Sequence, residues 1–120
     1  MFQTYNDDFW KAIDTLISSG RIIIDRPKGS VHPRFPHIKY AVDYGYIDNT
    51  TSMDGDCIDV WRGSLPTLNV DAIICTIDLI KKDSEIKLLI GCTEEEMTAV
   101  YDFHNASEFM KGILIRRENK

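Results

Sequence analysis

Hydrophobic residues near the start of the chain recur at helical spacing. Residues 6–18 place apolar side chains three and four positions apart, at Phe9, Trp10, Ile13, Leu16 and Ile17. Asn6 or Asp7 can cap the first turn, and Gly20 is a suitable stop. The pattern predicts an amphipathic helix whose apolar face packs against a core or against a partner subunit.

The rest of the chain alternates short β-branched runs with turns. Strands are predicted at residues 21–25, 40–46, 57–62, 70–80, 85–92 and 113–117. Residues 81–84 form the turn of a hairpin, and Thr93 with Glu96 can form the capping box of a second helix that runs to about residue 105. This order predicts an α+β domain, mostly β, whose strands form a small closed or partly open barrel.

Composition describes an ordinary globular chain. It has 120 residues, of which 43% are hydrophobic and 28% charged, so it can bury one core without disulfide staples. We therefore expect a single domain over residues 1–120, with residues 1–20 as an N-terminal helical extension. The net charge of −5 argues against nucleic acid or an anionic membrane as the main partner.

The cysteines and the lengths of the apolar runs indicate a cytoplasmic protein. An odd number of widely spaced cysteines without a Cys-x-x-Cys pair is typical of reduced thiols; they are Cys57, Cys75 and Cys92. No apolar run approaches membrane length, and the first residues lack the basic start of a signal peptide.

Two neighbouring segments carry opposite charge. Residues 40–59 hold five aspartates and no Lys or Arg, whereas residues 21–39 hold five Lys and Arg residues, two histidines and one acid, Asp25. Carboxylates are hard oxygen ligands for Mg²⁺, and guanidinium and ammonium groups hold phosphate. The two segments together suit a ligand that consists of a metal ion and a polyanion.

The centre of the acidic segment reads Asp54-Gly55-Asp56-Cys57-Ile58-Asp59. Gly55 permits a tight turn, so that Asp54 and Asp56 can converge, and Asp59 projects from the strand that follows. Three ionised carboxylates at one point need a cation between them. The alternative is a solvated acidic turn whose side chains splay outward.

Around this turn the sequence resembles a known family. Tyr40-x-x-x-Tyr44-Gly45-Tyr46, followed by Asp54-Gly55-Asp56-x-x-Asp59, resembles the signature of the soluble family I inorganic pyrophosphatases, Tyr-Pro-x-x-Tyr-Gly-Tyr and then Asp-Gly-Asp-Pro-x-Asp. Residues 24–33 are similar to the equivalent stretch of small bacterial members. The resemblance covers about residues 21–63 and, more loosely, residues 71–91. It implies a five-stranded OB-like β-barrel with flanking helices, the site at one barrel mouth, and Mg²⁺-dependent hydrolysis of inorganic pyrophosphate to two phosphates.

The resemblance also implies a role for each matching residue. Asp56 orients or deprotonates the attacking water, and Tyr44 lies beside that water. The implied metal ligands, for several Mg²⁺ ions or for Mn²⁺ instead, are Asp54, Asp59, Glu85 and Asp83, with Asp59 shared between two ions. The implied phosphate contacts are Tyr40, Lys87 and His32 or Arg34, with Arg26 and Lys28 in compensating roles. Pyrophosphate is the expected small-molecule partner, and family members often form homo-oligomers.

Some positions depart from the family pattern, so alternatives stay open. Phe103-His104-Asn105 stands where the family has a Tyr-Lys pair, and an early glutamate is missing. One alternative is a metal-dependent phosphohydrolase that acts on another small diphosphate. Another is a non-catalytic module that binds metal, phosphate or a partner protein. Glu85 and Lys87 can also be read as an ion pair across strands, and Cys57, without a nearby His base, as a small buried hydrophobe.

Overall fold

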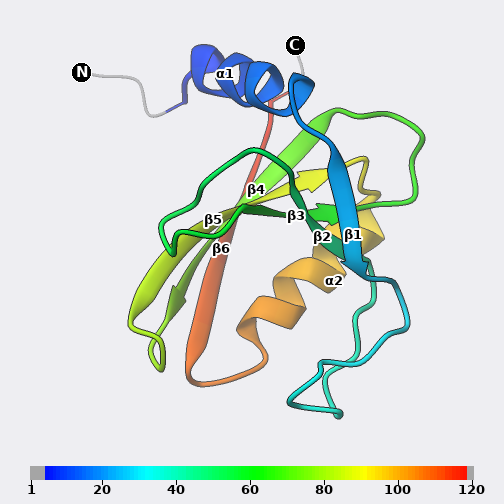
Figure 1. Ribbon diagram of the computed structural model, residues 1–120, viewed down its shortest axis with the longest axis vertical. Helices are drawn as coiled ribbons and strands as arrows, with labels where there is room; N and C mark the ends of the chain where they lie inside the picture. Colours follow the sequence, from blue (N-terminus) through cyan, green and yellow to red (C-terminus); the bar gives the residue numbers. More distant parts are fainter. Residues whose placement is uncertain (1–4, 119–120) are drawn as a thin grey trace.

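One mixed six-stranded sheet and two helices make up the protein, and the computed structural model describes residues 5–118 (Figure 1). The elements are α1 (Asp7–Ser18), β1 (Ile22–Arg26), β2 (Asp43–Ile47), β3 (Ile58–Arg62), β4 (Val70–Asp78), β5 (Asp83–Ile90), α2 (Glu94–Asn105) and β6 (Met110–Arg116). The strand order is β1-β2-β3-β5-β4-β6. Only β3 and β5 run parallel; each other neighbouring pair is antiparallel.

Both helices begin where the sequence predicts. The Asn6 side chain accepts a hydrogen bond from the backbone of Asp8 at 2.8 Å and caps α1. At α2, the Thr93 hydroxyl accepts from the Glu96 backbone at 3.2 Å while the Glu96 carboxylate accepts from the Thr93 backbone at 2.9 Å. The predicted capping box is therefore confirmed, because both of its hydrogen bonds are present.

The α+β class with mostly β structure is confirmed, but a closed five-stranded barrel is not shown. Six strands pair, and the edge strands β1 and β6 are not neighbours in the sheet. One physical reason lies at β6, where the peptide of Gly112 is already engaged. The side chain of Asn105 donates to its carbonyl and accepts from its N–H, each at 3.1 Å, so this part of the edge does not offer a free ladder.

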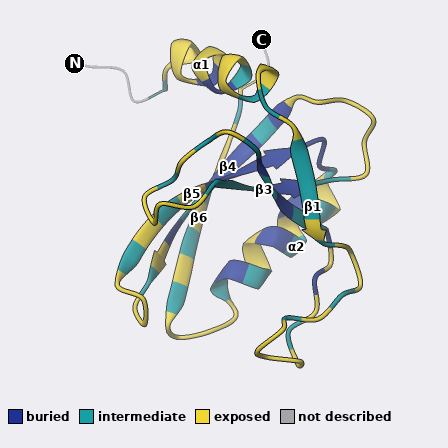
Figure 2. Ribbon diagram, in the orientation of Figure 1, coloured by how far each residue is buried: buried dark blue, intermediate teal, exposed yellow. Residues whose placement is uncertain are grey.

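A cluster of buried hydrophobic residues lies on each face of the sheet (Figure 2). On one face lie Tyr40, Val42, Trp61, Ala72, Ile74, Leu89 and Cys92, which pack with Met97 and Val100 of α2. Against α1 lie Ile47, Val60, Val70, Ile73, Leu88 and Ile90, which pack with Trp10 and Ile13 of the helix. The apolar face of α1 thus packs on the core of its own chain, one of the two partners that the sequence left open.

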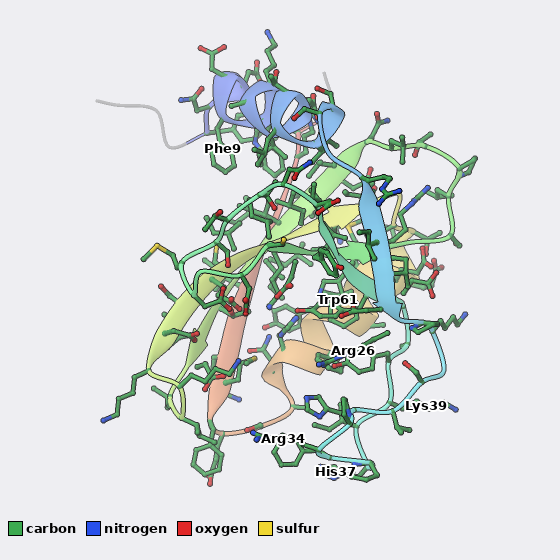
Figure 3. All side chains as sticks on the ribbon, viewed as in Figure 1. Phe9, Arg26, Arg34, His37, Lys39 and Trp61 are labelled. Atoms are coloured by element: carbon green, nitrogen blue, oxygen red, sulfur yellow. The ribbon has the colours of Figure 1, made fainter. Side chains whose placement is uncertain are left out.

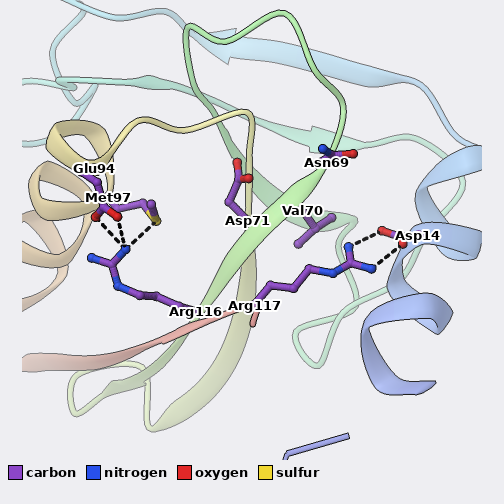
Figure 4. A pocket seen from close by; sticks show the side chains of 8 residues that line it. All are labelled: Asp14, Asn69, Val70, Asp71, Glu94, Met97, Arg116 and Arg117. Atoms are coloured by element: carbon purple, nitrogen blue, oxygen red, sulfur yellow. Dashed lines mark hydrogen bonds and ion pairs between the residues drawn. The ribbon is translucent and has the colours of Figure 1, made fainter. Parts of the chain in front are cut away.

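A polar hollow of about 560 Å³ separates the two helices near the end of β6 (Figure 4). Arg117 forms a two-pronged ion pair with Asp14 of α1, at 2.9 and 2.8 Å, and its guanidinium lies 5.9 Å from the Trp10 ring. Arg116 pairs with Glu94 of α2 at 2.6 Å. Because both guanidinium groups have carboxylate partners, we interpret the hollow as the place where each helix is tied to the end of the sheet.

No helix within residues 5–118 is long and apolar enough to cross a membrane. The three cysteines are free thiols.

Candidate functional site

Three neighbouring strands each bring one polar side chain to the same place. Tyr44 lies on β2, Asp59 at the start of β3 and Lys87 on β5. The Tyr44 hydroxyl donates to Asp59 Oδ2 at 2.7 Å, and Lys87 Nζ donates to the same oxygen at 2.8 Å and to Tyr44 Oη at 2.9 Å. The register of β2, β3 and β5 therefore builds a hydrogen-bonded triad from residues far apart in the sequence.

Glu85 completes the partners of Lys87. It lies two residues earlier on β5, on the same face of the strand, and its Oε2 accepts from Lys87 Nζ at 2.9 Å. An ammonium group has three protons, and here all three have acceptors. The sequence left open an ion pair between Glu85 and Lys87; that pair is present, along one strand instead of across two.

Burial and hydrogen-bond partners together determine the charge states of Lys87 and Tyr44. Lys87 is only 5% exposed. Burial alone lowers the pKa of Lys87, but Tyr44 and Asp59 outweigh it, so the pKa is raised above the usual lysine value. Burial raises the pKa of the Tyr44 hydroxyl, with Asp59 adding to the effect. Lys87 is therefore a permanent cation, and Tyr44 stays protonated as a hydrogen-bond donor.

Gly45 lets β1 and β2 approach beside this triad. It stands between the two tyrosines of the motif and pairs with Ile24 across the strands. A Cβ atom at Gly45 would overlap the carbonyl oxygen of Ile23. The glycine of the Tyr-Gly-Tyr motif thus has a packing reason that does not involve catalysis.

The Asp54 turn reaches the triad through Glu85. Gly55 has a φ of +87°, the left-handed conformation that the predicted tight turn requires. Asp54 Oδ1 accepts from the Ser52 hydroxyl at 2.6 Å and from the Asp56 backbone at 3.0 Å. The Ser52 bond, together with one from Glu85, lowers the pKa of Asp54 to about 2.

The pKa values of Asp54 and Glu85 shift in opposite directions. Burial raises the pKa of the Glu85 carboxyl, and the hydrogen bond with Asp54 raises it further. Two ionised carboxylates in contact repel each other unless a proton or a cation lies between them. The contact between Asp54 and Glu85 thus marks a place where a cation would be stabilised.

Acidic and basic side chains together line one cavity of about 590 Å³. Its carboxylates are Asp25, Asp48, Asp54, Asp56, Asp59 and Glu85. Its basic residues are Arg26, His32, Lys81 and Lys87. The acidic and basic segments of the sequence, together with the β4–β5 hairpin, therefore do meet in space.

Several residues singled out from the sequence lie outside this cavity. Tyr40 is 2% exposed and accepts a hydrogen bond from Arg26. Lys28 and Arg34 are exposed on the loop between β1 and β2 and do not line the cavity. Asp83 lies in the β4–β5 hairpin beside a different, shallow hollow with Met53.

Other residues of the site were missed. Asp25, Tyr46, Asp48 and Lys81 line the cavity, and so does Cys57, which is partly exposed and not the buried hydrophobe expected. Lys81 lies in the turn between β4 and β5. Predicting its place in the site would have required the direction in which that hairpin bends, which the sequence does not specify. Among the described residues, no three His, Cys, Asp or Glu side chains lie close enough to hold a metal ion by themselves.

Aromatic rings pack against Tyr44 of the triad. The Tyr44 ring centroid lies 4.5 Å from that of Trp61, whose indole N–H donates to His104 Nε2 at 3.1 Å. Phe103 packs on Trp61 at 5.1 Å. Phe103 and His104, which stand at the place of the family's Tyr-Lys pair, therefore belong to the aromatic core next to the site and do not line the cavity.

Neither a scan against protein-family models nor a search of curated proteins returns a match to this chain.

Proposed function

We propose that this protein is a small Mg²⁺-dependent hydrolase of inorganic pyrophosphate. The observation that carries the proposal is the bonded group of Tyr44, Asp59, Lys87, Glu85 and Asp54, which lines a cavity with basic residues at its rim. Acids for metal ions and cations for phosphates are the two components that diphosphate hydrolysis needs.

The side chains of the cavity fit Mg²⁺. All six of its acids offer carboxylate oxygens, which Mg²⁺ prefers to nitrogen or sulfur. Mg²⁺ is usually held by one or two carboxylates, several waters and substrate phosphates, so it does not require three converging acids. Asp54 and Glu85 would hold one ion, with waters and substrate phosphates as its other ligands, and Asp59 would be a ligand of a second ion. Bound there, Mg²⁺ or Mn²⁺ would neutralise phosphate charge and acidify a water molecule.

The chain's own residues have separate tasks in this proposal. Asp56, exposed at the cavity, orients the attacking water and accepts its proton. The Tyr44 hydroxyl, a permanent donor, fixes Asp59. Lys87, Arg26 and Lys81 offset the negative charge that develops on the leaving phosphate.

One observation favours a second candidate, a non-catalytic module that binds phosphate. Lys87 already compensates Asp59 and Glu85, at 2.8 and 2.9 Å, so the group is stable without a metal ion. In that case Lys87 has a structural role and is not free to contact substrate.

The proposal also carries two expectations from the sequence, a cytoplasmic location and assembly into a homo-oligomer. The uncovered part of the sheet face formed by β4, β5 and β6 is a candidate subunit surface. Its isoleucines are exposed: Ile77 at 53%, Ile86 at 47% and Ile113 at 62%.

The test is phosphate release from Mg-pyrophosphate by the purified protein. We expect release that EDTA abolishes and that Asp56→Asn reduces by at least about a hundredfold, within the range for loss of a general base. Asp102→Asn, an exposed acid on α2 that does not line the cavity, is the matched control and should retain full activity. A protein whose melting temperature rises with Mg²⁺ and pyrophosphate but which releases no phosphate would be the binding module instead.

A further inference from the structure

The loop of residues 27–39 is an ordered arm beside the cavity. It joins β1 to β2 and extends away from α1, past the end of β1 (Figures 1 and 3). Backbone hydrogen bonds link its two sides, from His32 to Ile38 and from Tyr40 to Ser30, each at 2.9 Å. Residues 26–39 contain no acid, although the whole chain has a net charge of −5.

An exposed aromatic ring lies on this arm, next to the cavity wall. Phe35 is 49% exposed. Its ring centroid lies 5.1 Å from that of His32, which itself lines the cavity. His32 Nδ1 accepts the backbone N–H groups of Arg34 and Phe35 at 3.0 and 3.3 Å, so the two rings are held at a fixed spacing. His37 lies on Phe35 edge-on, at 6.3 Å.

Positive charge surrounds the same point from two elements. Burial lowers the pKa of His32, and the positive charges of Arg26, Arg34, His37 and Lys81 lower it further. Lys81 belongs to the β4–β5 hairpin, so cations from both the arm and the hairpin act on His32. A phosphate group at this edge of the cavity would be attracted, and a group attached to that phosphate would lie beside Phe35.

We propose that the preferred ligand of this cavity is a nucleoside diphosphate, with its diphosphate in the cavity and its base stacked on Phe35. The inference rests on the proposed function, since it uses the same cavity and the same reaction. It extends the ligand from inorganic pyrophosphate to a diphosphate that carries a planar base. Inorganic pyrophosphate has no planar group that could cover the exposed part of the Phe35 ring. Stacking tolerates any base, because every base has a π face, and neighbouring cations reinforce it.

Hydrolysis of such a ligand follows the reaction proposed above. Water oxygen bonds to the terminal phosphorus, and the phosphoanhydride bond to the bridging oxygen breaks. The products are inorganic phosphate and a nucleoside monophosphate, and the proton lost by the water passes through Asp56 to solvent.

Calorimetric titration of ADP, pyrophosphate and tripolyphosphate at fixed Mg²⁺ tests the inference. One base stacked on an aromatic side chain is worth roughly five- to 150-fold in affinity. We expect Phe35→Ala to weaken ADP binding about tenfold and to leave pyrophosphate binding unchanged. Phe35→Trp should keep ADP affinity. Phe109→Ala is the matched control, since Phe109 is also 49% exposed but lies in the turn before β6 and not on the arm.

The outcomes separate this inference from the proposed function. Equal weakening of ADP and pyrophosphate by Phe35→Ala, or no weakening of either, overturns the stacking role. Tripolyphosphate binding as tightly as ADP overturns it too, because charge alone would then explain the affinity. If the wild-type protein binds pyrophosphate and hydrolyses it while ADP binds no better, only this inference fails. If it binds neither ligand, the proposed function fails with it.

Discussion

Acidification from pH 7 to pH 5 should destabilise the protein through a single buried histidine. His104 is 3% exposed. Its Nε2 accepts the Trp61 indole N–H at 3.1 Å, and its Nδ1 lies 3.3 Å from Met110 Sδ. Burial, with the charge of Lys87 adding to it, lowers the pKa of His104 to about 3. A proton on Nε2 would break the Trp61 hydrogen bond, because an imidazolium has no acceptor.

The size of the effect follows from proton linkage. The unfolded histidine titrates near its ordinary pKa of 6.5, whereas the folded one stays neutral until about pH 3. Between these values the unfolded state binds the extra proton, so stability is complete above pH 6.5 and is lost as the pH falls. Each pH unit is worth about 1.4 kcal/mol, so about 2 kcal/mol is lost by pH 5. That loss depends little on the folded pKa, which lies well below pH 5.

Urea unfolding followed by tryptophan fluorescence measures this loss. Wild-type protein should lose about 2 kcal/mol more between pH 7 and pH 5 than His104→Gln, whose amide oxygen can still accept from Trp61. Titration of the carboxylates and of the other histidines is common to both proteins and cancels. His37→Gln, which replaces an exposed histidine, should keep the wild-type pH dependence. An equal loss in wild type and His104→Gln would refute the argument that His104 is neutral in the folded state.

Three further substitutions probe the site. Lys87→Met should lower the free energy of unfolding by about 3 kcal/mol, because it leaves Asp59 and Glu85 without their buried cation; a loss below about 1 kcal/mol in urea unfolding would contradict the ion-pair role. Asp59→Asn should abolish phosphate release while the circular dichroism spectrum stays native, and substantial remaining turnover would refute its role as a metal ligand. Gly45→Ala should cost about 3 kcal/mol, since its Cβ would overlap the Ile23 carbonyl; an unchanged melting temperature would show that β1 and β2 can move apart.

Local features of the fold could be predicted because local sequence determines them. The Asn6 cap, the Thr93 capping box and the hairpin before β5 depend on residues within a few positions of each other. Strand pairing was harder, because the parallel contact of β3 with β5 joins segments that no local pattern connects. Closure of the sheet into a barrel was hard to predict for a similar reason. Whether a sheet closes depends on its edges, and an Asn105 side chain engages the Gly112 peptide there.

The site could be predicted in part for the same physical reason. Asp54, Asp56 and Asp59 share one short segment, so their nearness along the chain ensures nearness in space. Lys81 was missed, and Asp83, which was assigned to the site, lines a different hollow. Both lie at a hairpin whose direction the sequence does not specify. Resemblance to a family pattern identifies which residue types occur at which sequence spacing. It does not determine which side of a turn faces the cavity.

The charge of the cavity itself limits what it can bind. Six carboxylates line it against three permanent cations, Arg26, Lys81 and Lys87, so its walls are net negative if every acid is ionised. A bare diphosphate would then be repelled, since like charges about 4 Å apart cost roughly 1–4 kcal/mol even at high effective dielectric constants. Mg²⁺ ions reverse that balance because each brings two positive charges to the carboxylates. Pyrophosphate binding should therefore depend on Mg²⁺, and equally tight binding in EDTA would mean that the anion is held at the basic arm and not among the acids.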